Sequence, residues 1–319
     1  MKIFNIQNLY RQIIKKNHTS IGKAISLIES SKERTDIIKE KLLNKLIINI
    51  NNYGKSSIVV GFTGATGAGK STFINSLSLY IRKNIEKDIG IITIDPTSSM
   101  SQGSLMGDIA RMCSLYQDTN IFARASKPQT LQIALPVLIY DIIIVLISAC
   151  FEVIFVETVG TGQSDIDIYP LVDVLCFVMQ PIEGDEIQTI KKGLLELVHI
   201  ILINKCDDKT KYLAIKTRIL YMSSFQYDSS KDVLTVSGLH KKGIAKTWET
   251  IRKVYNRKNL SKYDTMGLLF KKNIAIITLH TLFRVGINRL WYKRSAYLFL
   301  HKKTSMIKSL NHLKKFLRD

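Results

Sequence analysis

The sequence predicts an α/β fold in which a mostly parallel sheet has helices on both faces, with helical extensions at both ends of the chain. Short apolar segments rich in Ile and Val alternate with segments of helical periodicity. Strands that are apolar along their whole length are typical of parallel sheets buried on both faces. The first such segment, SSIVVGF at 56–62, leads through a glycine-rich loop into KSTFINSLSLYIRKN. This order of strand, loop and helix is the context in which phosphate-binding loops occur.

The chain is expected to have three parts. Residues 1–54 form an N-terminal helical extension, because apolar residues recur there at helical spacing. Residues 55–255 form the α/β domain. Its expected strands are 56–62, 89–95, 152–158, 173–180, 199–205 and 233–238. Residues 256–319 are basic, show a helical pattern without a strand signal, and are expected to form a C-terminal arm.

The most apolar stretch of the chain, residues 133–157, is too interrupted to cross a membrane. Pro136, Asp141 and Glu152 lie within it, and only ten uncharged residues separate the two carboxylates. A spanning helix needs about 20 apolar residues. The sequence therefore predicts a buried helix followed by a buried strand, and no membrane span.

A net charge of +20 raises the possibility of a nucleic-acid or membrane-surface partner. Lys, Ile and Asn are abundant throughout, and the basic residues form no arginine-rich tract with interleaved aromatic residues before the C-terminus. We attribute most of the charge to compositional bias. No nucleic-acid partner is expected.

The cysteines predict reduced thiols and a cytoplasmic location, or the mitochondrial matrix if the source is eukaryotic. All four lie far apart in sequence and form no CxxC pair, so neither a disulfide framework nor a zinc site is indicated. The N-terminus lacks the apolar core of a signal peptide.

Residues 64–71, GATGAGKS, fit the phosphate-loop pattern GxxxxGK[ST]. Glycines let the backbone N–H groups turn toward a phosphate, and the following helix presents its positive N-terminus to the same anion. We expect Lys70 to reach the β- and γ-phosphates and the Ser71 hydroxyl to ligate Mg²⁺. The expected phosphate contacts are Gly64, Gly67, Ala68, Gly69, Lys70, Ser71 and Thr72. The expected domain is thus a P-loop NTPase.

A phosphate loop does not distinguish ATP from GTP, but NKCD at 204–207 favours GTP. It ends an expected strand, where open α/β sheets bind ligands. The Asp207 carboxylate can accept hydrogen bonds from the N1–H and 2-amino groups of guanine, a donor pair that adenine lacks. Asn204 and Lys205 are expected to brace the loop and cover the base. Ser237, which ends the next strand, is placed to close the base pocket.

Further acidic residues are candidates for the metal site. Glu157 ends the strand 152–158 and can hold Mg²⁺ through water, and the Gly160 N–H can sense a γ-phosphate. Asp95 and Asp108 are two more acids that could meet the metal, although each alone is more typical of a helix cap or a surface acid.

Taken together, these segments resemble the MeaB/ArgK-type GTPases, the accessory proteins of adenosylcobalamin-dependent methylmalonyl-CoA mutase. Matching segments run in the family's order from about residue 20 to 255. ETVGTGQS at 157–164 and GDEIQTIKKG at 184–193 are the most specific of them, far more so than the phosphate loop.

This resemblance implies a GTPase that binds GTP or GDP with Mg²⁺ and hydrolyses GTP slowly until a partner stimulates it. It implies that 184–192 is a switch-like loop from which Gln188 and Lys191 reach the nucleotide, where a lysine could stabilise charge on the transferring phosphoryl group. The implied catalytic residues are Lys70, Glu157, Gln188 and Lys191. The implied metal ligands are Ser71, Asp95, Asp108 and Glu157.

The resemblance also implies a partner, an adenosylcobalamin-dependent acyl-CoA mutase. Nucleotide binding and hydrolysis would gate the loading of adenosylcobalamin or the protection of the mutase. The implied assembly is a homodimer, in which the arm at 256–319 could serve for dimerisation.

Three other classes stay open. A nickel-type metallochaperone GTPase usually carries a histidine-rich stretch or a cysteine pair, whereas the six histidines here are dispersed. A degenerate, non-catalytic GTP-binding relative is compatible with residues 122–134, which lack the paired glycines usual in the family. A transport ATPase would prefer ATP over GTP.

Overall fold

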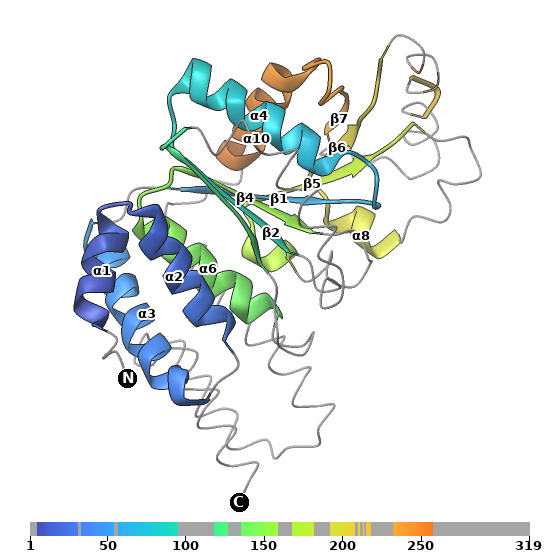
Figure 1. Ribbon diagram of the computed structural model, residues 1–319. Helices are drawn as coiled ribbons and strands as arrows, with labels where there is room; N and C mark the ends of the chain where they lie inside the picture. Colours follow the sequence, from blue (N-terminus) through green and yellow to red (C-terminus); the bar gives the residue numbers. More distant parts are fainter. Residues whose placement is uncertain are drawn as a thin grey trace, which may run out of the picture. The chain divides into compact units, whose positions relative to one another are not determined.

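A computed structural model describes most of the α/β domain and the N-terminal helices (Figure 1). The described residues are 5–30, 33–53, 57–94, 118–126, 135–158, 168–181, 192–207, 210, 213, 215–217 and 232–257. They divide into two compact units. One contains described residues of 5–53 and 135–150, and the other contains those of 57–126 and 151–257.

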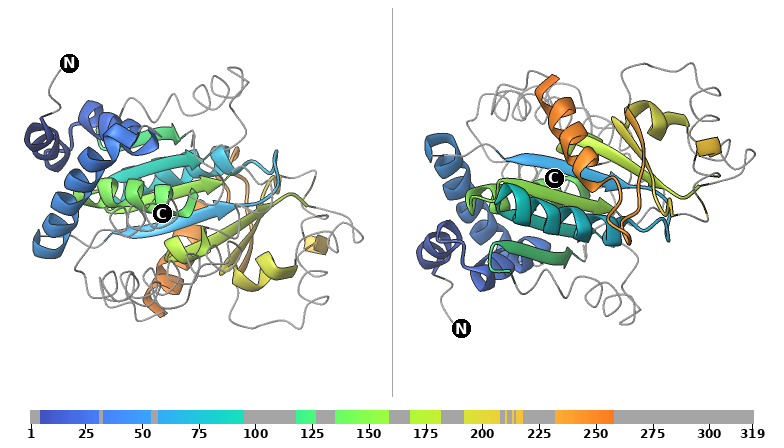
Figure 2. Two further views of the ribbon diagram at one scale, coloured as in Figure 1. Left: turned by 90° about the horizontal axis from the view of Figure 1, so that it is seen from below. Right: turned by 90° about the horizontal axis from the view of Figure 1, so that it is seen from above.

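The larger unit is built on a seven-stranded sheet in which every neighbouring pair of strands is parallel (Figures 1 and 2). The strand order is β3-β2-β4-β1-β5-β6-β7. The bounds are β1 Ile58–Thr63, β2 Ile89–Ile94, β3 Ile121–Ser126, β4 Val153–Thr158, β5 Val174–Met179, β6 Ile200–Ile203 and β7 Asp232–Thr235. Because the strands are parallel, all their carboxyl ends meet at one edge, which we call the carboxyl edge.

The predicted α/β fold with a parallel sheet is confirmed, and all six expected strands are present. The seventh strand, β3, was not expected. Its sequence IFARAS has only two large apolar residues and an arginine, and it lies at the outer edge of the sheet beside β2. An edge strand needs less apolar surface than a central one, so its sequence signal is weak.

Helices lie on both faces of this sheet. Helix α4, Lys70–Ile85, connects β1 to β2 in one direction across the sheet, and α8, Lys192–Leu197, connects β5 to β6 in the other. Right-handed crossovers therefore place the two helices on opposite faces (Figure 1). Helix α10, Ile244–Arg257, packs beside α4. A short 3₁₀ helix, Tyr169–Leu171, precedes β5.

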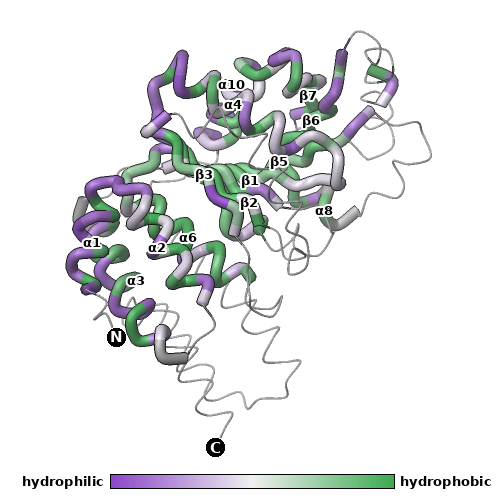
Figure 3. Tube along the Cα trace, in the orientation of Figure 1, coloured by the Kyte–Doolittle hydropathy of each residue, from purple (hydrophilic) through white to green (hydrophobic). Residues whose placement is uncertain are grey.

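The core on the α4 face is aromatic and aliphatic. Phe62 of β1 packs edge-on against Phe155 of β4, with ring centres 5.4 Å apart, and also contacts Phe73 of α4. Trp248 of α10 is buried in the same cluster. Figure 3 shows the strands as mainly hydrophobic, while the helices alternate between hydrophobic and hydrophilic residues. Because its strands are buried in this core, the sheet supports the loops at its carboxyl edge.

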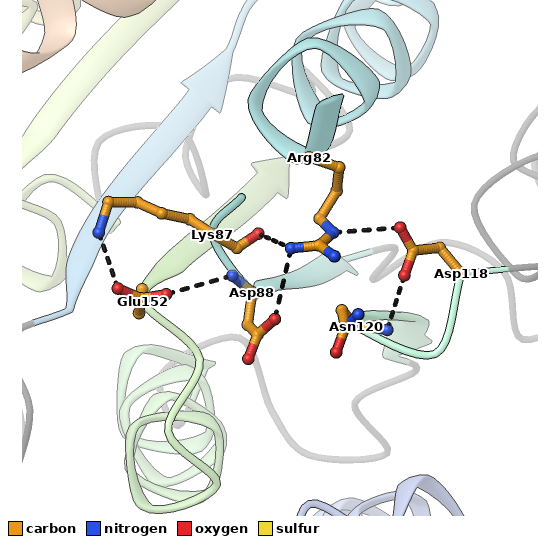
Figure 4. Close-up of polar contacts among 6 residues, drawn as sticks. All are labelled: Arg82, Lys87, Asp88, Asp118, Asn120 and Glu152. Atoms are coloured by element: carbon orange, nitrogen blue, oxygen red, sulfur yellow. Dashed lines mark hydrogen bonds and ion pairs between the residues drawn. The ribbon is translucent and has the colours of Figure 1, made fainter. Parts of the chain in front are cut away.

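At the opposite edge, where β2, β3 and β4 begin, charged side chains contact one another (Figure 4). Arg82, in the last turn of α4, lies 3.1 Å from Asp118 and 3.5 Å from Asp88. Lys87 lies 2.7 Å from Glu152. We call these residues, together with Asn120, the amino-edge network. It ties the end of α4 to the starts of three strands.

The smaller unit consists of α1 Ile6–Ile14, α2 His18–Glu29, α3 Glu33–Tyr53 and α6 Leu135–Ser148. Asn5 and Asn17 cap α1 and α2 by accepting hydrogen bonds from backbone N–H groups three residues later. Helix α6 packs against α2 and α3. The predicted helical character of the N-terminal part is confirmed.

The apolar stretch 133–157 contains the buried helix α6 followed by the buried strand β4, as predicted. Within the part of the chain that the structure describes, no helix has the length and apolar character needed to cross a membrane. The boundaries at 54/55 and 255/256 stay predictions, and residues 258–319 of the expected arm lie outside the described residues.

Candidate nucleotide-binding site

The phosphate loop runs between the end of β1 and the first residue of α4, and its geometry requires glycine. Gly64 has a φ of +133°, and a Cβ there would lie 1.9 Å from the carbonyl oxygen of Val178 in β5. Gly69 has a φ of +85°, and its Cβ would lie 2.6 Å from the side-chain nitrogen of Asn204. At Gly67 the φ is +80°, but an added Cβ would meet no atom of the described residues within 4 Å, so among these residues only the backbone conformation favours glycine.

Lys70 folds back over this loop. Its ammonium donates hydrogen bonds to the carbonyl oxygens of Gly64, at 2.7 Å, and Ala65, at 3.0 Å, and the residue is 6% exposed. A buried ammonium thus lies inside the loop, at the N-terminus of a 16-residue helix. Helix N-termini attract anions through their unpaired N–H groups. Thr72 is half-buried in the first turn of the same helix.

The Glu157 carboxylate at the end of β4 accepts hydrogen bonds from hydroxyl groups on two other elements. Ser71 of α4 donates to Oε1 at 2.7 Å, and Thr93 of β2 donates to Oε2 at 3.3 Å. Glu157 is 4% exposed. Hydroxyl and carboxylate oxygens are the ligands that Mg²⁺ prefers, so Ser71 and Glu157 fit this ion chemically.

Asn204, at the end of β6, connects the phosphate loop to a second loop. Its side-chain nitrogen donates to the carbonyl oxygens of Ala68, at 2.8 Å, and Gly69, at 3.3 Å. Its side-chain oxygen accepts from the Gly238 N–H at 3.0 Å. Asn204 is 2% exposed, so these bonds form in a dry environment where they hold the two loops firmly together.

The next residues turn the chain outward. Lys205 has a φ of +59°, which is unusual for a residue with a side chain, and its ammonium contacts the Gln180 side chain at 3.1 Å. The Cys206 N–H donates to the Val236 carbonyl oxygen, which ties this loop to the residue after β7. Local strain of this kind concentrates at binding sites.

The Asp207 carboxylate faces solvent beside this turn, with its side chain 39% exposed. Thr210 donates to Oδ1 at 2.5 Å, and His240 lies 3.8 Å from Oδ2. The hydrogen bond from Thr210 is the main cause of a lowered Asp207 pKa, with smaller contributions from a backbone N–H and from the charges of His240 and Lys242. The group is therefore an anionic acceptor at neutral pH.

Ser237 is buried in the loop after β7. Its N–H bonds to the Lys242 carbonyl oxygen, and its hydroxyl accepts from the His240 N–H. The structure thus shows it as a turn residue, and its predicted contact with the base stays a prediction. Gly238 follows closely against α4, where a Cβ would lie 2.8 Å from Cα of Phe73.

The structure therefore brings the described candidates to the carboxyl ends of β1, β4, β6 and β7. They are Gly64, Gly67, Ala68, Gly69, Lys70, Ser71, Thr72, Glu157, Asn204, Lys205, Asp207 and Ser237. The other candidates lie outside the described residues. These are Asp95, Asp108, Gly160, Gln188 and Lys191.

Among the residues that contact the site, Thr93, Thr210 and Gly238 were not selected from the sequence. Only Thr210 carried a signal, because a hydroxyl three residues after an aspartate is spaced for a local turn hydrogen bond. Thr93 and Gly238 reach their partners through strand pairing between distant segments. No local pattern marks such contacts.

The family model described as methylmalonyl Co-A mutase-associated GTPase MeaB matches residues 21–267. The chain belongs to this family. Among curated proteins, it is 32% identical to the GTPase ArgK of Escherichia coli over 76% of this chain and 73% of that protein. The predicted family resemblance is thereby confirmed.

Some of the curated relatives are longer than the part that this chain matches. The chain is 30% identical to the methylmalonic aciduria type A homolog, mitochondrial, of Caenorhabditis elegans, over 70% of this chain. It spans 57% of that relative and 62% of the mouse protein of the same description. Among solved structures, a LAO/AO transport system kinase matches with a TM-score of 0.68 at 23% identity, covering 100% of this chain and 99% of that one, which supports the fold.

Proposed function

We propose that this chain binds GTP with Mg²⁺ and hydrolyses it slowly until a partner protein stimulates the reaction. The observation that carries this proposal is the hydrogen bond of 2.7 Å between Ser71 and Glu157, directly beneath the phosphate loop that holds Lys70. It joins a hydroxyl and a carboxylate, two kinds of oxygen ligand that Mg²⁺–nucleotide sites use. The hydroxyl lies in the first turn of α4, at the helix N-terminus.

Guanine is the proposed base because Asp207 presents an ionised, accessible carboxylate at the same edge of the sheet. Two acceptor oxygens complement the N1–H and 2-amino group of guanine. Adenine offers no such donor pair. Lys205 is proposed to cover the base. Asn204 is proposed to hold the phosphate loop and the loop after β7 in a fixed arrangement.

In the proposed reaction, Lys70 and the loop N–H groups bind the β- and γ-phosphates and orient them for attack by water. A bound Mg²⁺ would neutralise charge on the transferring phosphoryl group. Ser71 and Glu157 would hold this ion, together with Asp95 and Asp108. Gly160 is proposed to sense the γ-phosphate.

We propose that residues of the 184–192 segment complete the catalytic site. Gln188 and Lys191 are proposed to approach the nucleotide when a partner binds, and Lys191 would stabilise the transition-state charge. Such an arrangement gives a low basal rate, because the hydrolytic residues are brought together only in the complex.

The proposed partner is an adenosylcobalamin-dependent acyl-CoA mutase, with GTP acting as a gate for cofactor loading or protection. Support comes from the family description, which names methylmalonyl Co-A mutase, and from relatives named after methylmalonic aciduria. A homodimer formed through the arm at 256–319 completes the proposal. A cytoplasmic or mitochondrial-matrix location would give access to such a mutase.

The test is a turnover assay with GTP and ATP, with and without methylmalonyl-CoA mutase. We expect slow GTP hydrolysis by the chain alone, a clear increase on adding the mutase, and little ATP hydrolysis. A preference for ATP would contradict guanine recognition. GTP binding without turnover in either condition would instead favour a non-catalytic relative, and unchanged turnover with mutase would reject this partner.

A further inference from the structure

We propose that Thr93 is a positioning residue that fixes the Glu157 carboxylate for magnesium binding. The inference rests on the proposed Mg²⁺–GTP function and adds a residue to it. Neither the phosphate-loop pattern nor the acidic candidates in the sequence point to Thr93. Its assignment comes from the pairing of β2 with β4.

Strand register places Thr93 directly beside Glu157. The two residues are Cα partners on adjacent parallel strands, so their side chains leave the same face of the sheet. This is the face on which α4 lies, because Ser71 at the start of α4 reaches the same carboxylate. The register of β2 and β4 thus places the Thr93 hydroxyl next to the Glu157 carboxylate.

The two hydroxyl groups donate hydrogen bonds to different oxygens of the Glu157 carboxylate. Ser71 donates to Oε1 at 2.7 Å and Thr93 donates to Oε2 at 3.3 Å. A carboxylate held at both oxygens by separate elements is restricted in rotation about its terminal torsion, which is otherwise broad. Thr93 therefore sets the plane in which Glu157 presents its oxygens.

This arrangement also suits Ser71 as a magnesium ligand. A hydroxyl that gives its proton to a carboxylate keeps oxygen lone pairs available for a cation. Ser71 can act in this way only while Glu157 stays ionised and correctly oriented. Hydrogen-bond partners of metal-site ligands are known to affect metal affinity on the order of 10- to 100-fold.

The alternative role for Thr93 is general support of the sheet, which would affect nucleotide binding with and without magnesium to the same extent. A positioning role predicts a magnesium-specific effect that depends on the hydroxyl group. Thr93→Val keeps the shape and β-branching but removes the hydroxyl, whereas Thr93→Ser keeps the hydroxyl. Thr93→Ala removes the hydroxyl without adding apolar bulk, and serves if the valine variant does not fold.

The experiment measures the affinity for a fluorescent GDP analogue while magnesium is raised from zero, in EDTA, to millimolar concentrations. For Thr93→Val we expect the magnesium concentration that gives the half-maximal effect to rise on the order of 10-fold. Affinity in EDTA should match the wild type, and Thr93→Ser should lie close to the wild type under both conditions.

The matched control is Thr250→Val in α10, where a buried threonine hydroxyl donates only within its own helix, to the Lys246 carbonyl oxygen. It should follow the wild-type magnesium curve. An unchanged magnesium midpoint in both Thr93→Val and Thr93→Ala would overturn the positioning role, as would an equal loss of affinity with and without magnesium. If wild-type binding itself ignores magnesium, the proposed magnesium site fails and the role of Thr93 falls with it.

Discussion

The two edges of the sheet use the same elements in different ways. At the carboxyl edge, α4 begins with Lys70 and Ser71, and β4 ends with Glu157. At the amino edge, α4 ends near Arg82, and Glu152 precedes β4. Both edges carry buried or half-buried charges, and the hydrogen bonds and ion pairs described above differ between them.

Charges at the amino edge are matched with opposite charges. Arg82 contacts Asp118 and Asp88, and Lys87 contacts Glu152. At the carboxyl edge, Lys70 donates hydrogen bonds to two backbone carbonyl oxygens, and Glu157 accepts hydrogen bonds from two hydroxyl groups. A charge held by neutral dipoles keeps its attraction for an ion of opposite sign. We therefore expect the amino edge to stabilise the fold and the carboxyl edge to bind a charged ligand.

The helix dipole reinforces this division. The positive N-terminus of α4 carries the phosphate loop, and its negative C-terminus carries Arg82 in the last turn. The comparison predicts that substitutions at the two edges separate binding from stability.

The largest effect is expected for Lys70→Ala. Loss of an ammonium that would make charge-assisted hydrogen bonds to two phosphates should weaken GTP binding on the order of 100-fold or more. Stability should change less than affinity, because the ammonium contacts backbone carbonyl oxygens of its own loop. Calorimetric titration with GTP and urea unfolding measure the two quantities. Lys83→Ala, at an exposed position of the same helix, is the control; undiminished GTP affinity in Lys70→Ala would refute the phosphate-loop assignment.

A smaller change, in specificity, is expected for Asp207→Asn. An amide replaces one acceptor oxygen by a donor, so GTP should bind on the order of 10-fold more weakly and xanthosine triphosphate more tightly. Competition between the two nucleotides measures the shift. Glu249→Gln, an exposed position on α10, is the control. Unaltered preference for GTP would mean that guanine is recognised elsewhere.

Local parts of this site could be predicted from the sequence because their residues are adjacent in the chain. The strand, glycine-rich loop and helix around Lys70 fall in this class, as does the strand that ends before the loop at 204–207. Contacts across elements could not be predicted in the same way. The Asn204 bond to Ala68 joins residues 136 positions apart, and the Thr93 bond to Glu157 joins residues 64 apart. Both depend on strand order and register.

The amino-edge network illustrates the same limit. Arg82 and Asp118 meet only because β3 pairs with β2, and β3 has too few apolar residues to be recognised as a strand. Charged residues near strand ends are ordinary in surface loops, so their pairing leaves no mark in the sequence. A fold's stabilising contacts are thus harder to predict than a binding loop whose chemistry imposes a fixed pattern.

Arg82→Ala tests the amino edge and should have the opposite outcome to Lys70→Ala. The Arg82 side chain is 18% exposed and contacts two carboxylates and the Lys87 carbonyl oxygen. We expect a loss of about 1–2 kcal/mol in the free energy of unfolding, smaller at high salt, with nucleotide affinity unchanged. Urea unfolding of the variant and of the Lys83→Ala control measures it. A fall in GTP affinity like that of Lys70→Ala would show that the edges are not independent.

The smallest expected effect is the acid sensitivity of the amino edge. Partial burial tends to raise the Asp118 pKa, but hydrogen bonds from the Asn120 N–H and from Arg82, together with the charge of Arg82, lower it overall. The folded protein then binds fewer protons at this carboxyl than the unfolded chain does. The resulting stability is present above the ordinary pKa of about 3.9 and is lost as pH falls through the lowered folded value.

Asp118→Asn should therefore be less stable than the wild type at pH 7, by less than about 1 kcal/mol because the carboxylate is partly exposed. The difference should shrink as the pH is lowered below about 4, since the wild type then loses the charge that the variant never had. Urea unfolding at a series of pH values, with Glu249→Gln as the exposed control, measures this convergence. A difference that stays constant with pH would mean that Asp118 acts through shape or hydrogen bonding alone, and that the amino edge does not owe its stability to matched charges.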